Sequence, residues 1–297
     1  MDFITEKDIN VFNISNEHTK NKNDKNNKLR EKIIWAIVNK KIPEHYYLIP
    51  EWLDIKNKSF DFIYKLNNNR DYINVECVCK GGRKFNYDFT FTIFYEDNTS
   101  EIFNIEFKFN LTTISGAPQF VSPMKPSQYM YHSFENEFYE NYVEKLSTEL
   151  ELQKPDKEVY LKEIHSPDPE CMKVYKEKYY KGSKRSSEFT NKEEDIKFYK
   201  LANKLSKESI KTFIENTELN IELLSQYLIK SQRNKIYMLY SKNGFTMETV
   251  DIDDYIIVRY IKSYNRFNCY NKKGKLIKVL LRWKNGNGIA FPAFQIS

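Results

Sequence analysis

The amino-acid sequence predicts a mixed α/β protein, because two kinds of apolar periodicity occupy different parts of the chain. Apolar and polar residues alternate, as in half-buried strands, over residues 72–109 and again from residue 235 onwards. Apolar residues recur at helical spacing over residues 27–40 and through much of the middle of the chain. Hydrophobic residues at 40% and charged residues at 30% of 297 residues are typical of a globular protein with a substantial core.

The N-terminal half is predicted to begin with a polar arm, continue with one helix and end in three strands. Residues 1–28 are rich in Lys, Asn and Asp, which indicates a mobile arm. The helix over 27–40 ends before Pro43, which limits its extension. Turn-forming residues over 96–100 separate the second strand from the third. The three strands are expected over residues 72–79, 86–95 and 102–109.

The rest of the chain is predicted to hold a helical middle and a β-rich end. Helices are expected over residues 127–152 and 170–180, and over 192–229 in two or three pieces. Strands are expected over residues 236–240, 256–261 and 276–283. The predicted organisation is a polar arm over 1–28, a mixed α/β core over 29–152, a helical segment over 153–234 and a basic β-rich region over 235–297.

Three charged side chains lie on the polar face of the predicted hairpin. Asp88 lies on that face of the first strand, and Glu106 and Lys108 lie on that face of the second. If the loop is centred near Asp97, residues whose numbers add up to about 195 face each other, which places Asp88 within one residue of both partners. The three side chains are therefore expected to converge above the hairpin.

This combination of residues suits metal-assisted hydrolysis of a phosphate ester. The carboxylates of Asp88 and Glu106, helped by the backbone carbonyl of Phe107, can hold a hard divalent cation such as Mg²⁺, which prefers oxygen ligands. Such a cation polarises a phosphate and activates a water, while Lys108 can orient that water or stabilise developing negative charge. The alternative interpretation is a solvated cluster of salt bridges, because antiparallel sheets commonly carry one polar face.

The spacing of Asp88 and Glu106-x-Lys108 resembles the PD-(D/E)xK nucleases, the restriction-endonuclease-like superfamily. The resemblance covers roughly residues 28–122 and departs from the superfamily's motif in having Tyr87 before the aspartate. It implies a central mixed sheet flanked by helices, a Mg²⁺ cofactor for which Mn²⁺ can substitute, and catalytic roles for Asp88, Glu106 and Lys108.

The same resemblance assigns two further residues to the site. Glu31 lies on the otherwise apolar face of the predicted first helix, and in the superfamily a helix before the sheet often lends an acidic residue. Gln119, within Pro118-Gln119-Phe120, is similar to a glutamine element that follows the ExK strand in parts of the superfamily, including restriction-like proteins of large DNA viruses and some bacteria. For both residues the alternative is an ordinary surface position.

Positive charge is concentrated at the C-terminal end. The nine basic residues of 255–297 are accompanied by no Asp or Glu, so the first 254 residues carry a net charge of −3 against +6 for the whole chain. Basic residues interleaved with aromatic residues favour contact with a nucleic acid. The alternative is an ordinary β-rich region whose sheet edges are protected by Lys. The predicted nucleic-acid-binding residues are Arg259, Lys262, Arg266, Lys272, Lys273, Lys275, Lys278, Arg282 and Lys284.

Other chemistry finds no support in the sequence. The four cysteines have no zinc-ligand spacing, and the four histidines lie in no recognisable nucleophile motif. The N-terminus has no apolar core of a signal peptide, and no segment approaches the ~20 apolar residues that span a bilayer. A cytoplasmic protein without a membrane partner is therefore expected.

The function predicted from these patterns is that of a Mg²⁺-dependent endonuclease acting on DNA. Two alternatives stay open: a non-catalytic nucleic-acid-binding or structural protein, and a nuclease of the same fold that acts on RNA or branched DNA. A homodimer is compatible with the first function, because a double-strand cut needs two active centres.

Overall fold

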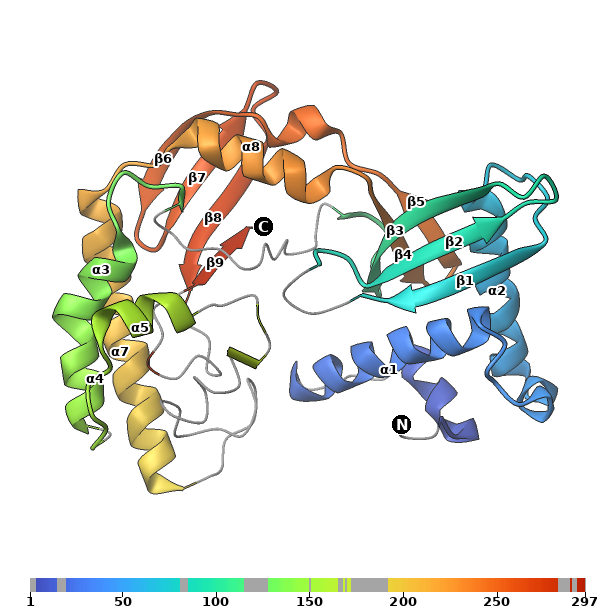
Figure 1. The fold of residues 1–297 in the computed structure, drawn as a ribbon, viewed down its shortest axis with the longest axis horizontal. Helices are drawn as coiled ribbons and strands as arrows, with labels where there is room; N and C mark the ends of the chain where they lie inside the picture. Colours follow the sequence, from blue (N-terminus) through green and yellow to red (C-terminus); the bar gives the residue numbers. More distant parts are fainter. Residues whose placement is uncertain are drawn as a thin grey trace. The chain divides into compact units, whose positions relative to one another are not determined.

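The computed structural model divides the chain into two compact units, each with its own sheet and core (Figure 1). The first unit consists of Met1–Ala117 and Asn234–Val250, and the second of Pro118–Arg233 and Asp251–Ser297. The structure describes residues 4–14, 20–80, 85–114, 128–149, 151–164, 168, 170–171, 192–282, 289 and 293–296. The predicted fold class, a mixed α/β protein with a central mixed sheet flanked by helices, is confirmed.

The first unit is built on a five-stranded mixed sheet with strand order β1-β2-β3-β4-β5. Its strands are β1 (Asn74–Cys79), β2 (Phe89–Phe94), β3 (Ser100–Phe109), β4 (Lys235–Ser241) and β5 (Gly244–Glu248). The first three strands form an antiparallel meander, β4 joins β3 in parallel, and β5 pairs with β4 as an antiparallel hairpin. Strands β3 and β4 are parallel neighbours, and such strands require a crossover connection. In the sequence, this connection is the whole helical middle of the chain.

The hairpin of β2 and β3 forms as its alternation predicts, with a register one residue from the expected one. Phe89 pairs with Ile105 and Phe94 with Ser100, so facing residue numbers add up to 194. The loop is closed by a hydrogen bond of 3.0 Å from the Tyr95 N–H to the Thr99 carbonyl. Asn98 has a φ of 61°, a left-handed conformation that Asn tolerates and that lets so short a loop reverse the chain.

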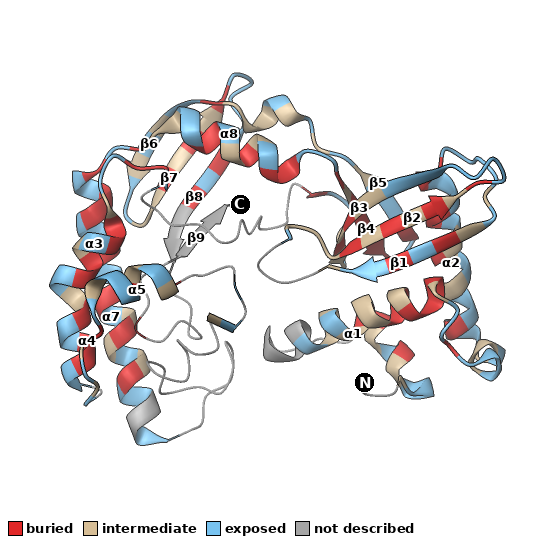
Figure 2. Ribbon diagram, in the orientation of Figure 1, coloured by how far each residue is buried: buried red, intermediate tan, exposed pale blue. Residues whose placement is uncertain are grey.

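Helices α1 (Lys20–Val38) and α2 (Pro50–Leu66) share one hydrophobic cluster with the apolar residues of the five-stranded sheet. Buried residues recur along both helices and along the strands (Figure 2). The cluster takes Phe89, Phe91 and Ile105 from the strands, which leaves the alternate strand residues on the opposite face. Helix α2 was not predicted, because exposed apolar residues such as Leu53 and Tyr64 obscure its buried stripe.

The prediction of a mobile arm over residues 1–28 is wrong for the parts that the structure describes. The 3₁₀ helix η1 (Glu6–Phe12) buries Ile9 and Phe12 in the core of the first unit. The Arg30 Nε donates a hydrogen bond of 2.6 Å to the Val11 carbonyl, which ties η1 to α1. Helix α1 itself begins at Lys20, inside the polar run. Burial of the Ile9 and Phe12 side chains holds this segment against the core, although most of its residues are polar.

The second unit contains a four-stranded antiparallel sheet with order β6-β7-β8-β9. Its strands are β6 (Ile257–Ser263), β7 (Arg266–Asn271), β8 (Leu276–Arg282) and β9 (Ala293–Ile296). Its helices are α3 (Phe134–Phe138), the π-helical η5 (Tyr139–Val143), α4 (Glu144–Glu149), α5 (Lys157–Glu163), α7 (Glu193–Asn216) and α8 (Ile221–Gln232), with the 3₁₀ helix η6 (Ile252–Tyr255) before the sheet. The helix predicted over 170–180 lies outside the described residues beyond Cys171.

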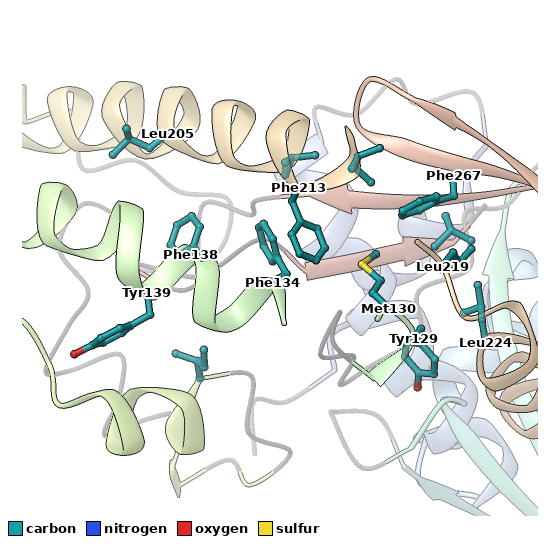
Figure 3. Close-up of a cluster of buried hydrophobic side chains, with 14 of the residues drawn as sticks. Tyr129, Met130, Phe134, Phe138, Tyr139, Leu205, Phe213, Leu219, Leu224 and Phe267 are labelled. Atoms are coloured by element: carbon teal, nitrogen blue, oxygen red, sulfur yellow. The ribbon is translucent and has the colours of Figure 1, made fainter. Parts of the chain in front are cut away.

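The helices of the second unit pack against one face of its sheet. Phe134 of α3 and Phe213 of α7 meet with ring centroids 4.7 Å apart, in the cluster that also holds Phe267 of β7 (Figure 3). The helical stretch predicted over 192–229 in two or three pieces forms two helices, α7 and α8, and Asn220 caps α8 by accepting a hydrogen bond of 3.0 Å from the Leu223 N–H.

The division into units differs from the predicted domain boundaries. Strands β4 and β5 fall within the predicted basic region over 235–297, yet they complete the sheet of the first unit. The reason is their composition: Tyr237, Met238 and Leu239 are fully buried and need a sheet neighbour on each side. In the part of the chain that the structure describes, no helix has the length and apolar character to cross a membrane.

The edge strand β1 is protected by a side chain just after the C-terminal end of α1. The Asn39 side chain donates to the Cys77 carbonyl at 2.9 Å and accepts from the Cys77 N–H at 3.0 Å. It thereby satisfies a backbone pair that an edge strand would otherwise present to another chain.

We expect Asn39→Ala to lower the melting temperature by roughly 2–4 °C, since it removes hydrogen bonds worth about 1 kcal/mol. The exposed Asn57 of α2 provides the matched control, and Asn57→Ala should melt at or above the wild type because Ala is the better helix former. The measurement is thermal unfolding followed by circular dichroism. An unchanged melting temperature for Asn39→Ala would contradict the capping role.

Candidate active site

Asp88 lies directly before β2 and is fixed by three hydrogen bonds that involve neighbouring backbone. Its N–H donates to the Ile105 carbonyl at 2.9 Å, and its carbonyl accepts from the Lys80 N–H at 2.7 Å. Its carboxylate oxygen Oδ2 accepts from the Phe107 N–H at 2.8 Å. The carboxylate therefore has one defined position beside β3, since both its own backbone and its acceptor oxygen are held.

Glu106 and Lys108 lie on the face of β3 opposite the core residues Ile105 and Phe107, as a period of two requires. The Lys108 Nζ is 2.6 Å from the Glu106 Oε1. Only 15% of the Glu106 side chain and 23% of the Lys108 side chain are exposed. This ion pair is therefore shielded from solvent to an extent that a surface salt bridge is not.

A second lysine, which the sequence pattern did not single out, reaches the same carboxylate from β4. The Lys235 Nζ lies 3.9 Å from the Glu106 Oε2 and donates a hydrogen bond of 2.9 Å to the Asn86 carbonyl. Its side chain is 5% exposed, and burial is the main cause that lowers its pKa. The sequence feature that could have indicated Lys235 is its position in the alternation, which is in phase with the buried residues Tyr237 and Leu239. Its partner could not be inferred, because β3 and β4 are far apart in the chain.

Glu31 of α1 faces the same group of charges. Burial, then the charges of Asp88 and Glu106, raise its pKa to about 8, against the opposing effect of Lys28 and Lys108. Burial and the charge of Glu106 raise the pKa of Asp88 to about 6, while the hydrogen bond from Phe107 opposes the rise. The carboxylates of Asp88 and Glu106 are thus close enough to the Glu31 carboxyl group to disfavour its ionisation.

The oxygen donors fit a cation that keeps part of its water shell. Among the residues that the structure describes, no three His, Cys, Asp or Glu stand in an arrangement that would enclose a metal ion. Asp88 and Glu106 nevertheless offer carboxylate oxygens next to the backbone of Phe107, and Mg²⁺ is commonly bound by one or two carboxylates with several waters. Burial and, after it, repulsion from neighbouring carboxylates raise the pKa of Asp88 and Glu31, and a divalent cation would relieve the repulsion.

The structure thus brings together four of the five residues assigned to the site: Glu31, Asp88, Glu106 and Lys108. The fifth, Gln119, lies outside the described residues.

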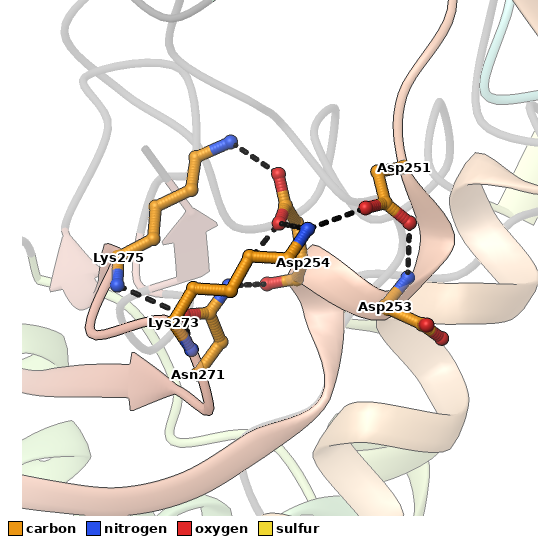
Figure 4. A network of polar contacts seen from close by, with 6 residues as sticks. All are labelled: Asp251, Asp253, Asp254, Asn271, Lys273 and Lys275. Carbon is orange, nitrogen blue, oxygen red and sulfur yellow. Dashed lines mark hydrogen bonds and ion pairs between the residues drawn. The ribbon is translucent and has the colours of Figure 1, made fainter.

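Three of the predicted nucleic-acid-binding residues are engaged in ion pairs. Lys273 lies 2.5 Å from Asp251 and 3.1 Å from Asp254, and Lys275 lies 2.8 Å from Asp254 (Figure 4). Lys262 lies 2.8 Å from Glu218. These carboxylates precede residue 255 in the sequence, so the absence of acidic residues over 255–297 did not reveal them. The expectation that all nine basic residues face a polyanion therefore needs revision for these three.

The other six basic residues fall into two groups. Arg259, Arg266, Lys272 and Lys278 have no carboxylate within ion-pair distance among the described residues. Arg282 ends β8 with a side chain that is not described, and Lys284 lies outside the described residues.

Comparison with known proteins adds little to this geometry. No protein-family model matches the chain, and no characterised protein matches its sequence. A solved structure that is similar is the restriction endonuclease MspI in complex with its cognate DNA, at 14% identity over 84% of this chain and 82% of that chain. The TM-score of this match is 0.27, which is too low to establish a shared fold or a shared function.

The raised pKa of Glu31 predicts a specific dependence of stability on pH. Because its pKa rises from 4.5 in the unfolded chain to about 8 in the folded protein, the folded state binds the proton more tightly, and stability falls as pH rises between these values. In EDTA, Glu31→Gln should therefore melt above the wild type at pH 8.5, by roughly 2–4 °C for each kcal/mol of this linkage, and equal it below about pH 4. The exposed Glu76 of β1 supplies the control, since Glu76→Gln should leave the pH dependence unchanged. A pH-independent difference for Glu31→Gln would contradict the assignment.

The interaction between Lys235 and Glu106 can be measured by a double-mutant cycle. We expect Lys235→Met and Glu106→Gln to be coupled by about 0.5–3 kcal/mol in urea unfolding, because each leaves the other's charge less compensated in a shielded site. The exposed Lys242, in the turn between β4 and β5, serves as control, and Lys242→Met should be additive with Glu106→Gln. Additivity of the Lys235 cycle would show that the two side chains do not interact.

Proposed function

We propose that this chain is a Mg²⁺-dependent nuclease that hydrolyses phosphodiester bonds of DNA. The observation that carries the proposal is the convergence of Glu31, Asp88 and Glu106 with Lys108 in one partly buried group. A solvated cluster of salt bridges, the competing interpretation, would be exposed and would satisfy each charge with water. Here burial and then the charges of Asp88 and Glu106 raise the pKa of Glu31, and burial and then the charge of Glu106 raise the pKa of Asp88; a bound cation would offset the repulsion among these carboxylates.

The residues that would hold Mg²⁺ are Asp88 and Glu106, with the carbonyl of Phe107. When bound, the cation would supply Lewis-acid activation of a scissile phosphate and of a water molecule. Asp88 is suited to this role because the Phe107 N–H fixes one of its oxygens at 2.8 Å, which leaves the other oxygen for a ligand. Glu106 is held from two sides by Lys108 and Lys235, so its carboxylate is oriented before any ligand arrives.

Lys108 and Glu31 are assigned complementary roles around the reacting phosphate. The Lys108 ammonium has three donors and is 23% exposed, so it can contact Glu106 and a phosphate oxygen together and stabilise negative charge that develops there. Glu31, whose pKa of about 8 keeps it protonated at neutral pH, can donate a hydrogen bond to a phosphate oxygen or to the attacking water. Asp88 and Glu106 alone could not combine donors with acceptors in this way.

We expect duplex DNA to be cleaved in Mg²⁺ and left intact in EDTA. Asp88→Asn and Lys108→Met should each reduce the rate by roughly 100-fold or more, because the first removes a carboxylate that would hold Mg²⁺ and the second removes a cation that acts on the developing charge. Asp61→Asn and Lys65→Met, at exposed positions of α2, are matched controls that should cleave at the wild-type rate. The assay follows the conversion of supercoiled plasmid, with single-stranded, junction and RNA substrates in parallel. Cleavage that persists in EDTA, or full activity of both site variants, would refute the proposal.

A further inference from the structure

The sheet of the second unit has a face that is turned away from its core and carries positive charge. On the core side, Phe267 and Cys269 of β7 and Val279 of β8 are fully buried. The alternate residues point the other way, because successive side chains of a strand alternate between faces. We call this second side the outer face; its described members are Arg259, Ile261, Ser263, Arg266, Asn268, Tyr270, Leu276 and Lys278.

The register of the strands places the charged groups of the outer face in neighbouring rows. Arg259 pairs with Tyr270, and its guanidinium lies 4.0 Å from the centre of the Tyr270 ring. Asn268 of β7 pairs with Lys278 of β8 in the next row, and Arg266 lies two residues along β7 from Asn268. A β-bulge between Ile257 and Arg259 sets the direction of the arginine, since Ile257 remains buried while Arg259 is exposed.

Positive charge on the outer face is not neutralised within the described chain. None of the residues over 255–297 is acidic, so no acidic residue belongs to β6, β7, β8 or β9. The carboxylates that approach this sheet, Glu218, Asp251 and Asp254, pair with Lys262, Lys273 and Lys275, which are not on the outer face. Arg266 hydrogen-bonds through Nε to the neutral side chain of Asn265 at 3.0 Å, which leaves its charge uncompensated.

We propose that the outer face holds the phosphate backbone of duplex DNA through Arg259, Arg266 and Lys278. Arginine presents a planar fork of donors that matches a phosphate, and lysine presents a point charge. Asn268, between these charges, adds a neutral donor of the kind that contacts phosphate oxygens. This inference rests on the proposed nuclease function for the choice of DNA, and it identifies the surface that binds the substrate.

Duplex rather than single-stranded DNA fits the chemistry of this face. Binding of single strands relies on aromatic rings on which bases stack. The aromatic ring among the described members of the outer face, Tyr270, is half-buried and lies beneath the Arg259 guanidinium. Stacked in this way, the ring orients the arginine toward a phosphate instead of receiving a base.

The test compares two triple variants of the full chain that lose the same charge. The face variant carries Arg259→Ala, Arg266→Ala and Lys278→Ala, and the control variant carries Lys262→Ala, Lys273→Ala and Lys275→Ala. Binding of two labelled duplexes of unrelated sequence is titrated in EDTA over a series of salt concentrations. Thermal melting verifies that each variant is folded, and the double variant Arg259→Ala with Lys278→Ala, both at exposed positions, replaces the face variant if Arg266→Ala prevents folding.

We expect the face variant to bind both duplexes roughly 10-fold or more weakly, with the slope of log K against log salt reduced by about 1 for each phosphate that is no longer neutralised. The control variant should stay within about twofold of the wild type, because its lysines are already paired with carboxylates. Equal weakening in both variants would show that net charge alone governs binding and would overturn the inference. Wild-type affinity of the face variant, or tighter binding of single strands than of duplex by the wild type, would likewise overturn it.

The outcome is separable from that of the nuclease proposal, because binding is measured without a divalent cation. If the wild type cleaves DNA and the face variant binds normally, the outer face is excluded while the nuclease proposal stands. If the two triple variants differ as expected and the wild type never cleaves, the surface stands and the nuclease proposal falls.

Discussion

The parallel pairing of β3 with β4 is the constraint on which the first unit depends. It joins two segments far apart in the sequence, with Glu106 opposite Tyr237 and Asn104 opposite Lys235. Without β4 and β5, the strand β3 would be an unpaired edge, and the buried Met238 would be missing from the core that α1 and α2 cover. The same pairing carries Lys235 to Glu106. Core formation and the electrostatics of the candidate site therefore follow from one non-local pairing.

The candidate site differs from an ordinary polar sheet face in how its charges are compensated. Glu106 has two lysines at hand, whereas Asp88 has its direct hydrogen bond from a backbone N–H. Among the described residues Glu31 gains no comparable partner, and burial together with the neighbouring carboxylates raises its pKa to about 8. A fold that retains such an unfavourable carboxyl group gives up stability at neutral pH. Groups of this kind cluster at functional sites, because a bound ligand compensates their unfavourable charge.

Much of the first unit could be predicted from local sequence patterns, and the elements that could not be predicted were missed for physical reasons. The period of two in β2 and β3 predicted both strands and the convergence of Asp88, Glu106 and Lys108, and the register was one residue away. Helix α2 was missed because its exposed apolar residues blur the buried stripe, and β5 because it is short and starts directly at Gly244. Lys235 could not be placed, since parallel pairing across a long crossover leaves no local signal.

The C-terminal region shows how far a charge count along the sequence can mislead. The run without acidic residues suggested nine equivalent basic residues, but Asp251 and Asp254 of the segment before β6 fold back onto Lys273 and Lys275. Coulomb energy depends on distance in space, so a carboxylate just outside the run neutralises charge inside it. Arg259 and Lys278 escape this effect because the β-bulge before Arg259 and the strand phase of Lys278 place both side chains on the outer face, where no described carboxylate pairs with them. Strand phase is indicated by the sequence except where a bulge shifts it, as before Arg259, and the positions of the nearby acids are not indicated by the sequence. Together they decide which basic residues can meet a polyanion.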